Sequence, residues 1–266
     1  MDLCRNPEWQ YLHGFTSWSG PRPRKLSPLF SFAKTTMHSD LLCVPLEQFV
    51  NTPSSDPEWE DKKFEKLIWR GSMTGVWYDG TTWWRSSQRS RLHFLSQAKE
   101  GSRFVRFTDP EGKGGRIMEK EVDLATLNER YLDAGYVEDL HQCTPDEGGC
   151  EEIPKQITTV KGMDWESQND YKYIVDVDGN AWSGRFHRLM ASNSLVFKST
   201  VSIFPIHTIR LITHFRGSVW LTVSPLVLVY VDLPRMVQRQ DHALVSLRPS
   251  EGRLHGSLRP HGFLLW

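Results

Sequence analysis

The stretch from residue 171 to residue 199 constrains the fold more than any other part of the chain. Residues 171–177 alternate apolar side chains and predict a β-strand, which ends in a short loop around Gly179. Residues 183–192 then place large apolar side chains on one face of a helix, and residues 194–198 return as a strand. A strand, a loop, a helix and a second strand in this order predict an α/β layered fold with a largely parallel sheet.

The preceding residues continue the same pattern of elements. The periodicity predicts, in chain order, a strand over 64–69, a helix over 89–99, a strand over 103–107 and a helix over 124–134. Asp123 is placed to cap the start of the helix over 124–134, and Gly135 is placed to end it. We therefore assign residues 61–200 to one α/β region.

The two flanking segments differ from this region in composition. Residues 1–60 hold seven prolines and predict a loop-rich connecting or edge region. Residues 201–266 hold seven arginines but no lysine, five of the ten histidines, and apolar runs without clear periodicity. This shift indicates a different origin for the tail, and we expect it to supply no regular strands or helices to the sheet.

Bulk composition excludes one class of function. The chain has 266 residues, and its 32 lysines and arginines balance 32 aspartates and glutamates, so the formal net charge is zero. A nucleic-acid-binding protein that works through bulk positive charge is therefore not expected. Residues 1–18 lack the apolar core of a signal peptide, and no apolar run has the length of a transmembrane helix. We expect no targeting signal within this chain.

Two of the four cysteines, Cys143 and Cys150, bracket a short loop that holds one proline and two glycines. Cysteines across such a turn are placed to form a disulfide bond, and the alternative is a reduced pair in a cytosolic protein. A zinc site needs more ligands at suitable spacing than the nearby His141 supplies, so we expect no metal.

The loop after the strand over 171–177 has the composition of an anion-binding site. Gly179 and Gly184 allow the backbone to approach a ligand closely, while Ser183 is placed to cap the following helix. Arg185 would lie in the first turn of that helix, where a guanidinium and unpaired N–H groups suit a diphosphate. The alternative is a tight turn followed by an arginine held in a structural ion pair.

A second candidate loop follows the strand over 64–69. Residues 69–75 combine Arg70 with two glycines and two hydroxyl side chains, and Arg85, Arg89 and Arg91 follow. Four arginines so close together suit an anionic ligand, although a solvated helix face explains Arg85 better. Candidates for a catalytic base are Asp40, Asp176 and Asp178, and the spacing singles out none of them.

These blocks resemble glycosyltransferase family 90, which holds the fungal capsule-associated glycosyltransferases and the animal protein O-glucosyltransferases. The resemblance covers about residues 4–200, and the blocks occur in the family's order. The matching blocks are residues 31–34, 40–45, 69–75, 89–92, 171–186 and 195–199. The last two are the most specific, and the abundance of tryptophan together with the loop between the paired cysteines is similar to the fungal branch.

The resemblance implies a GT-B architecture, in which two Rossmann-like halves hold the donor in their cleft, here incomplete at both ends. It implies an inverting transfer of xylose or glucose from a UDP-sugar to a polysaccharide or glycoprotein, with no cofactor and no catalytic metal. It also implies the Golgi apparatus or endoplasmic reticulum, where a disulfide persists. Carried over by position, the donor-binding residues are Arg70, Gly71, Ser72, Thr74, Arg89, Arg91, Gly179, Asn180, Ser183, Gly184 and Arg185.

The chain departs from the family pattern in three places. The family's catalytic aspartate and its membrane anchor are expected upstream of this chain, which leaves Asp40 as a weak candidate for the base. From residue 201 onward the family resemblance stops, and the tail resembles a retained intron or a shifted reading frame. The first alternative is therefore a catalytically inactive fragment that retains nucleotide-sugar binding. The second is an unrelated arginine-rich module that binds phosphate.

Overall fold

A computed structural model describes residues 7–17, 28–32, 34, 39–43, 55–80, 83–108, 117–140, 142–145, 148–199, 218–224 and 227–232. Its centre is a six-stranded sheet with the strand order β6-β3-β7-β8-β10-β9. The parallel strands are β3 (Phe64–Gly71), β6 (Leu132–Tyr136), β7 (Tyr171–Val177) and β8 (Leu195–Ser199). β10 (Val227–Asp232) pairs antiparallel with β8, and β9 (Ser218–Ser224) pairs antiparallel with β10. The expected mixture of helices with a largely parallel sheet is observed.

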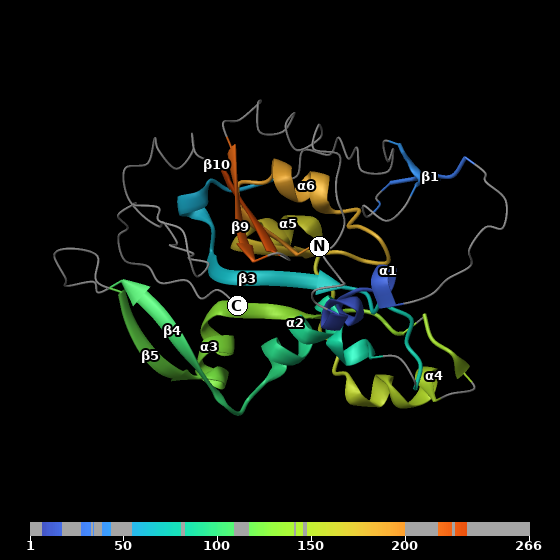
Figure 1. The fold of residues 1–266 in the computed structure, drawn as a ribbon. Helices are drawn as coiled ribbons and strands as arrows, with labels where there is room; N and C mark the ends of the chain where they lie inside the picture. Colours follow the sequence, from blue (N-terminus) through green and yellow to red (C-terminus); the bar gives the residue numbers. More distant parts are fainter. Residues whose placement is uncertain are drawn as a thin grey trace.

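Helices cover both faces of this sheet. In Figure 1, α2 (Gln88–Gln97) and α3 (Leu124–Tyr131) lie on one side of β3, while α5 (Trp165–Asn169) and α6 (Phe186–Ala191) lie on the other. Side-chain oxygens accept backbone N–H groups at the first turn of three of these helices, and the capping residues are Ser87, Asp123 and Asp164. These caps satisfy donors that a helix start leaves without a partner.

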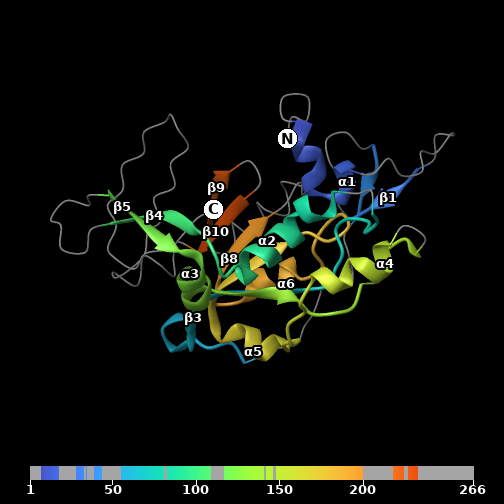
Figure 2. The same ribbon diagram turned by 90° about the horizontal axis from the view of Figure 1, so that it is seen from below.

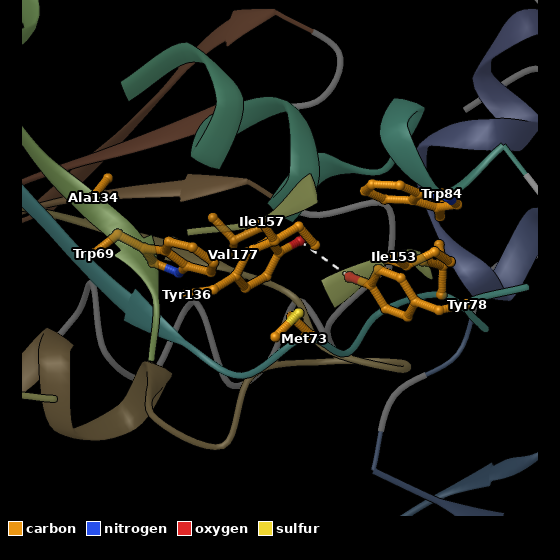
Figure 3. Close-up of a cluster of buried hydrophobic side chains, with 10 residues drawn as sticks. Trp69, Met73, Tyr78, Trp84, Ala134, Tyr136, Ile153, Ile157 and Val177 are labelled. Atoms are coloured by element: carbon orange, nitrogen blue, oxygen red, sulfur yellow. Dashed lines mark hydrogen bonds between the residues drawn. The ribbon is translucent and has the colours of Figure 1, made fainter. Parts of the chain in front are cut away.

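Two hydrophobic clusters follow from the pleat of β3. Ile68 and Trp69 are successive strand residues, so their side chains point to opposite faces of the sheet. The cluster around Trp69 is shown in Figure 3 and also contains Met73, Val76, Tyr78, Trp84, Ala134, Tyr136, Ile153, Ile157 and Val177. The cluster around Ile68 contains Tyr171, Ile174, Phe186, Leu189, Met190 and Val196. The hydroxyls of Tyr78 and Tyr136 lie 3.1 Å apart and satisfy each other inside the first cluster.

The remaining elements are short or lie outside the main sheet. They are η1 (Pro7–Leu12), α1 (Gly14–Ser17), β1 (Phe30–Ser31), β2 (Leu41–Leu42), η3 (Trp59–Asp61), η4 (Trp84–Ser86), β4 (Ser102–Thr108), β5 (Ile117–Asp123), α4 (Gly149–Glu152) and η6 (Pro154–Gln156). β4 and β5 form a separate antiparallel pair at the end of the molecule away from β1 and α4 (Figure 2). Among the described residues, no helix is long and apolar enough to cross a membrane.

The largest departure from the predicted elements lies between residues 124 and 136. We predicted one helix over 124–134 that ends at Gly135, but α3 ends at Tyr131 and the chain continues as strand β6. A Cβ atom on Gly135 would lie 2.7 Å from Cγ2 of Val160. The glycine therefore permits close packing against the sheet edge and does not end a helix.

The tail also differs from expectation. We expected residues 201–266 to supply no strands, yet β9 and β10 extend the sheet beyond β8. Backbone pairing explains this outcome, because the exposed edge of β8 presents N–H and C=O groups that a further strand satisfies. Whether the tail takes part in function stays a prediction.

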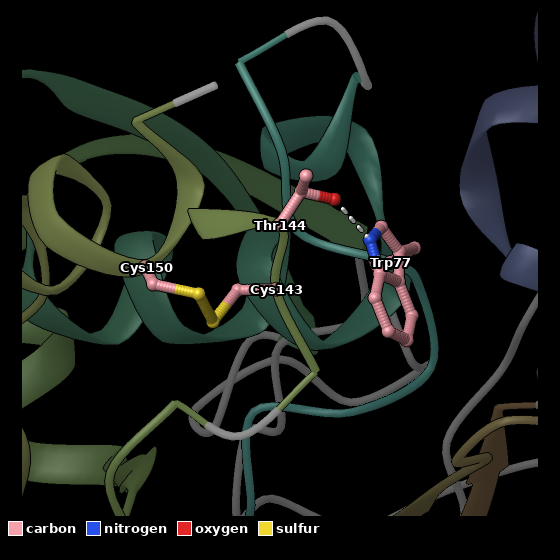
Figure 4. Close-up of a disulfide and its surroundings, with 4 residues drawn as sticks. All are labelled: Trp77, Cys143, Thr144 and Cys150. Carbon is pink, nitrogen blue, oxygen red and sulfur yellow. Dashed lines mark hydrogen bonds between the residues drawn. A yellow bond between two sulfur atoms is a disulfide. The ribbon is translucent and has the colours of Figure 1, made fainter. Parts of the chain in front are cut away.

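Cys143 and Cys150, the two cysteines expected to pair, are joined by a disulfide with a Cα–Cα distance of 5.2 Å. The bridged loop contacts the segment after β3, where Trp77 Nε1 donates to Thr144 Oγ1 at 2.7 Å (Figure 4). The backbone N–H of Tyr78 also donates to the carbonyl of Gln142 at 2.9 Å. The disulfide therefore closes the loop, and these hydrogen bonds hold it against the segment that follows β3.

Removal of this disulfide should destabilise the protein. A bridge that closes a loop with a sequence separation of 7 restricts the unfolded chain and contributes roughly 2–3 kcal/mol. We expect the double substitution Cys143→Ser and Cys150→Ser to lower the free energy of unfolding by that amount in urea titrations. The matched control is Cys43→Ser, which changes a cysteine outside any disulfide. Equal stability of the double variant and the wild type would contradict the prediction.

Candidate functional site

The two loops rich in glycine and arginine lie side by side because β3 and β7 are adjacent parallel strands. The residues after Gly71 and after Val177 therefore emerge at the same edge of the sheet. The chain runs from β3 to β6 on one side and from β7 to β8 on the other. Where two neighbouring strands connect onward in opposite directions, their loops separate and leave a crevice, and open α/β sheets bind their ligands in such crevices.

Arg89 joins the two loops from helix α2. Its guanidinium donates to the carbonyl oxygens of Ser72 at 2.7 Å and Asp178 at 2.9 Å, and to Thr74 Oγ1 at 2.7 Å. The side chain is buried, and burial together with the charge of Arg185 lowers the pKa of Arg89. Arg89, predicted to bind the donor, is thus a structural tie between the loops.

The two loops touch at a pair of glycines. Gly75 has a φ of 99°, and a Cβ atom there would lie 3.3 Å from the carbonyl oxygen of Gly179. The N–H of Gly75 donates to Asn180 Oδ1 at 3.1 Å, and its carbonyl accepts from the N–H of Gly14 at 2.6 Å. Burial lowers the pKa of the adjacent His13 to about 4, so this side chain is neutral at pH 7. Residues near the N-terminus thus pack against the crevice.

A buried group of charges lies beneath the loop that follows β7. Lys198 Nζ donates to Asp176 Oδ2 at 2.8 Å and to Asp178 Oδ1 at 2.5 Å. Ser183 Oγ donates to Asp176 Oδ1 at 2.5 Å, and Arg185 Nη2 lies 3.7 Å from the same oxygen. Asp176 and Asp178, considered as catalytic bases from the sequence, are therefore counter-ions of a buried lysine.

The pairing sets the protonation states of this group. Burial alone would raise the pKa of Asp176, but the charges of Lys198 and Arg185 outweigh it and hold that pKa below its ordinary value. Burial likewise disfavours the charge on Lys198, but Asp176 and Asp178 outweigh burial and raise the pKa of the lysine. Asp176 and Lys198 are therefore both charged at neutral pH.

These pKa shifts determine how the stability of the fold changes with pH. Asp176 contributes stability above the pKa of an unfolded aspartate, about 3.9, and this contribution is lost as the pH falls through the lower folded pKa. Lys198 contributes below the pKa of an unfolded lysine, about 10.4, and this contribution is lost as the pH rises through the higher folded pKa. The buried group therefore stabilises the fold across the neutral range.

The start of helix α6 differs from the prediction. We expected a helix over 183–192 capped by Ser183, but α6 begins at Phe186 and Arg185 occupies the N-cap position without a side-chain cap. The hydroxyl of Ser183 instead satisfies the buried carboxylate of Asp176, because a buried charge without hydrogen bonds is costly. Gly184 is exposed, and a Cβ atom there would have no neighbour within 4 Å.

A pocket of about 320 Å³ opens where β3, β6 and β7 end. It is lined by Arg70, Gly71, Ser72, Val137, Glu138, Gly162, Met163, Gln168 and Arg185. Four of these, namely Arg70, Gly71, Ser72 and Arg185, are predicted donor-binding residues from the two loops. A concave site of this size with a few convergent polar groups suits a small polar ligand.

The two arginines of the pocket differ in the donors that remain available. Arg70 Nη2 pairs with Asp133 Oδ1 at 2.6 Å, Nη1 donates to the carbonyl of Asp133 at 2.7 Å, and Nε donates to the carbonyl of Lys161 at 3.1 Å. Arg185 Nη1 donates to the carbonyl of Arg70, whereas Nη2 has no hydrogen-bond partner within the described residues. This Nη2 atom is buried and lies 3.7 Å from Asp176 Oδ1, but the Arg185 side chain as a whole is 27% exposed. Arg70 is 9% exposed and is committed to Asp133.

Other predicted residues do not line the pocket. Thr74, Gly179 and Asn180 hold the two loops together through the contacts described above. Arg91 is exposed on α2 and is not among the lining residues. Asp40, the weak candidate for a catalytic base, accepts a bond from Lys34 Nζ at 2.9 Å through its backbone carbonyl and does not line the pocket either.

Five residues that line the pocket were not predicted from the sequence. Val137 and Glu138 follow β6, and they were overlooked because that strand was predicted to be the end of a helix. The signal that would have found them is the run Gly135-Tyr136-Val137, since a glycine followed by aromatic and β-branched residues is typical of a strand. Gly162, Met163 and Gln168 come from the connection to β7, where no motif was recognised.

No protein-family model, curated protein or solved structure matches this chain. In the part of the chain that the structure describes, no group of three or more His, Cys, Asp or Glu is placed to hold a metal ion. The function is therefore inferred from the pocket and its charges.

Loss of the buried lysine should unfold the site. Lys198→Met leaves Asp176 and Asp178 as buried carboxylates without their cation, and breaking a buried pair in this way costs about 3–5 kcal/mol. We expect urea titrations at pH 7 to show that loss. The control is Lys155→Met, which removes an exposed lysine paired with Glu152 and should leave the unfolding free energy unchanged. Equal effects of the two substitutions would show that the buried pairing is unimportant.

The contact between the two loops should depend on Gly75. Gly75→Ala forces an L-residue to adopt a φ of 99° and brings its Cβ against the carbonyl of Gly179. Backbone strain of this kind costs of order 1–3 kcal/mol, and we expect a matching loss in the free energy of unfolding. Gly162→Ala is the control, because its Cβ would have no neighbour within 4 Å. A stable Gly75→Ala variant would refute the close approach.

Proposed function

We propose that this chain is the donor-binding part of a glycosyltransferase that resembles family 90. In this proposal the six-stranded region is one Rossmann-like half of a GT-B enzyme, and a UDP-sugar occupies the pocket at the ends of β3, β6 and β7. One observation carries the proposal. Two of the six sequence blocks that carry the resemblance, residues 69–75 and 171–186, meet at one pocket, where Arg185 donates to the carbonyl of Arg70 across 115 residues of sequence.

The chemistry of the pocket supports a diphosphate ligand. Transfer of a sugar from UDP leaves negative charge on the departing diphosphate, and fixed donors that stabilise such charge are the usual source of catalysis. Arg185 provides a partly exposed guanidinium at the pocket, and a guanidinium matches phosphate oxygens geometrically. Ser72 adds a hydroxyl at the end of β3. We therefore assign the phosphate contacts to Arg185 and Ser72.

The expected biological setting follows from the same proposal. A disulfide between Cys143 and Cys150 supports an oxidising compartment, which would be the endoplasmic reticulum or the Golgi apparatus. We propose UDP-xylose or UDP-glucose as the donor and a polysaccharide or glycoprotein as the acceptor.

A second candidate function is nucleotide-sugar binding without transfer. An inverting transferase needs a base that takes the proton of the acceptor hydroxyl. Asp176 and Asp178 are unsuited to this task because Lys198 pairs with both of them. Release of UDP from UDP-glucose or UDP-xylose in the presence of an acceptor would distinguish the enzyme from the binding protein.

Donor binding is tested most directly with UDP. We expect Arg185→Ala to weaken UDP binding by roughly 1.5–3 kcal/mol, the usual contribution of a hydrogen bond to a charged group. The control is Arg91→Ala, which removes the same charge from an exposed helix position outside the pocket. Isothermal titration calorimetry measures both, and thermal unfolding shows whether each variant remains folded. Equal UDP affinity of a folded Arg185→Ala variant and the wild type would overturn the proposal.

A further inference from the structure

Glu138 is the lining residue of the pocket that an anion-binding site does not explain. It follows β6, and its carboxylate has no hydrogen bond or ion pair within the described residues. The hydroxyl of Ser72 likewise has no hydrogen bond there, and the guanidinium of Arg185 is partly exposed at the same pocket. An acceptor without a partner therefore lines the same pocket as two groups that can donate.

These groups come to the pocket from different strands. Glu138 follows β6 and Arg185 follows β7, and both strands are neighbours of β3 in the sheet. The guanidinium of Arg185 donates to the carbonyl of Arg70 on β3. No ion pair joins Glu138 to Arg185 among the described residues, so the two charges do not neutralise each other directly. The pocket lining thus includes an anionic wall at Glu138 and a cationic wall at Arg185.

The carboxylate of Glu138 limits which chemical groups of a ligand can lie next to it. A carboxylate repels phosphate oxygens, so the diphosphate of a nucleotide is disfavoured next to Glu138. An ionised carboxylate is an acceptor only, with two oxygens that suit neighbouring hydroxyl donors. A neutral group rich in hydroxyls satisfies this wall, and a sugar is such a group.

We propose that Glu138 accepts hydrogen bonds from hydroxyl groups of the transferred sugar, and that Arg185 on the cationic wall binds the adjoining phosphate. Glu138 is then a residue that determines sugar specificity. This inference rests on the proposed function, because it assumes that a nucleotide-sugar occupies the pocket. It adds the orientation of that ligand, with the sugar toward β6 and the phosphate toward β7.

The test compares UDP with UDP-glucose by calorimetry, using the wild type, Glu138→Gln and Asp139→Asn. Glu138→Gln keeps the shape of an exposed side chain, and Asp139→Asn removes the same charge from an exposed neighbour outside the pocket. We expect Glu138→Gln to weaken UDP-glucose about tenfold, as for loss of a charge-assisted hydrogen bond. The same variant should bind UDP as tightly as the wild type or more tightly, and Asp139→Asn should change neither affinity.

Failure of this inference is separate from failure of the proposed function. If the wild type binds UDP and Arg185→Ala loses it, but Glu138→Gln binds UDP-glucose like the wild type, then the role of Glu138 is overturned and the proposed function stands. A parallel loss of UDP and UDP-glucose in Glu138→Gln also overturns it, because the residue would then shape the pocket without contacting the sugar. A wild type that binds neither ligand overturns both.

Discussion

The candidate site depends on one buried ammonium group. Lys198 lies on β8 and is almost completely inaccessible to solvent. Its ammonium group contacts the carboxylates of Asp176 on the neighbouring strand β7 and of Asp178, which directly follows that strand. Transfer of each of these charges out of water is costly, and their mutual attraction offsets the cost only when the geometry is good. One ammonium cannot balance two carboxylates, so the second oxygen of Asp176 needs another partner. Ser183 and Arg185 fill that need from the loop after β7. The position of Arg185 at the pocket is therefore a consequence of charge compensation beneath it.

Arg89 has a structural role, in contrast to Arg185 at the pocket. The buried guanidinium of Arg89 donates its hydrogen bonds to backbone carbonyls and to a threonine hydroxyl, so it is not placed to bind a ligand. Its contacts fix the loop after β3 relative to the loop after β7. Arg185 can then face the pocket from a backbone whose position is already set. The site thus combines one arginine that orders the loops with one that is able to bind.

The sequence was a good guide to strands β3, β4, β7 and β8 and a poor guide to the other strands of the region and to the roles of the arginines. β7 and β8 were predicted because their apolar patterns are unambiguous, whereas β6 was missed because Leu124, Leu127 and Ala134 continue a helical spacing past the end of α3. The loops around Arg70 and Arg185, which the family resemblance assigns to one site, are neighbours in the structure because β3 and β7 are adjacent parallel strands. Their role in binding a donor stays a prediction. Whether an arginine binds a ligand or has a structural role depends on how deeply it is buried and on its hydrogen-bond partners. Both are set by the tertiary fold and cannot be read from the local sequence. Asp133 commits Arg70 from β6, a strand that the sequence did not predict.

The missed strand changes the chemistry expected of the pocket. With the two predicted loops alone, the lining is Arg70, Gly71, Ser72 and Arg185, which is a cationic site for any phosphate. The contribution from β6 adds Glu138, and an anion such as free UDP then meets repulsion on one side. An intact UDP-sugar would place hydroxyls there, so the same wall would favour the donor over the diphosphate that remains after transfer. In a transferase, a lower affinity for UDP than for the donor would speed product release, because weakly bound UDP occupies the site for a shorter time. Under the proposed function, the carboxylate and the guanidinium would together distinguish the donor from the product.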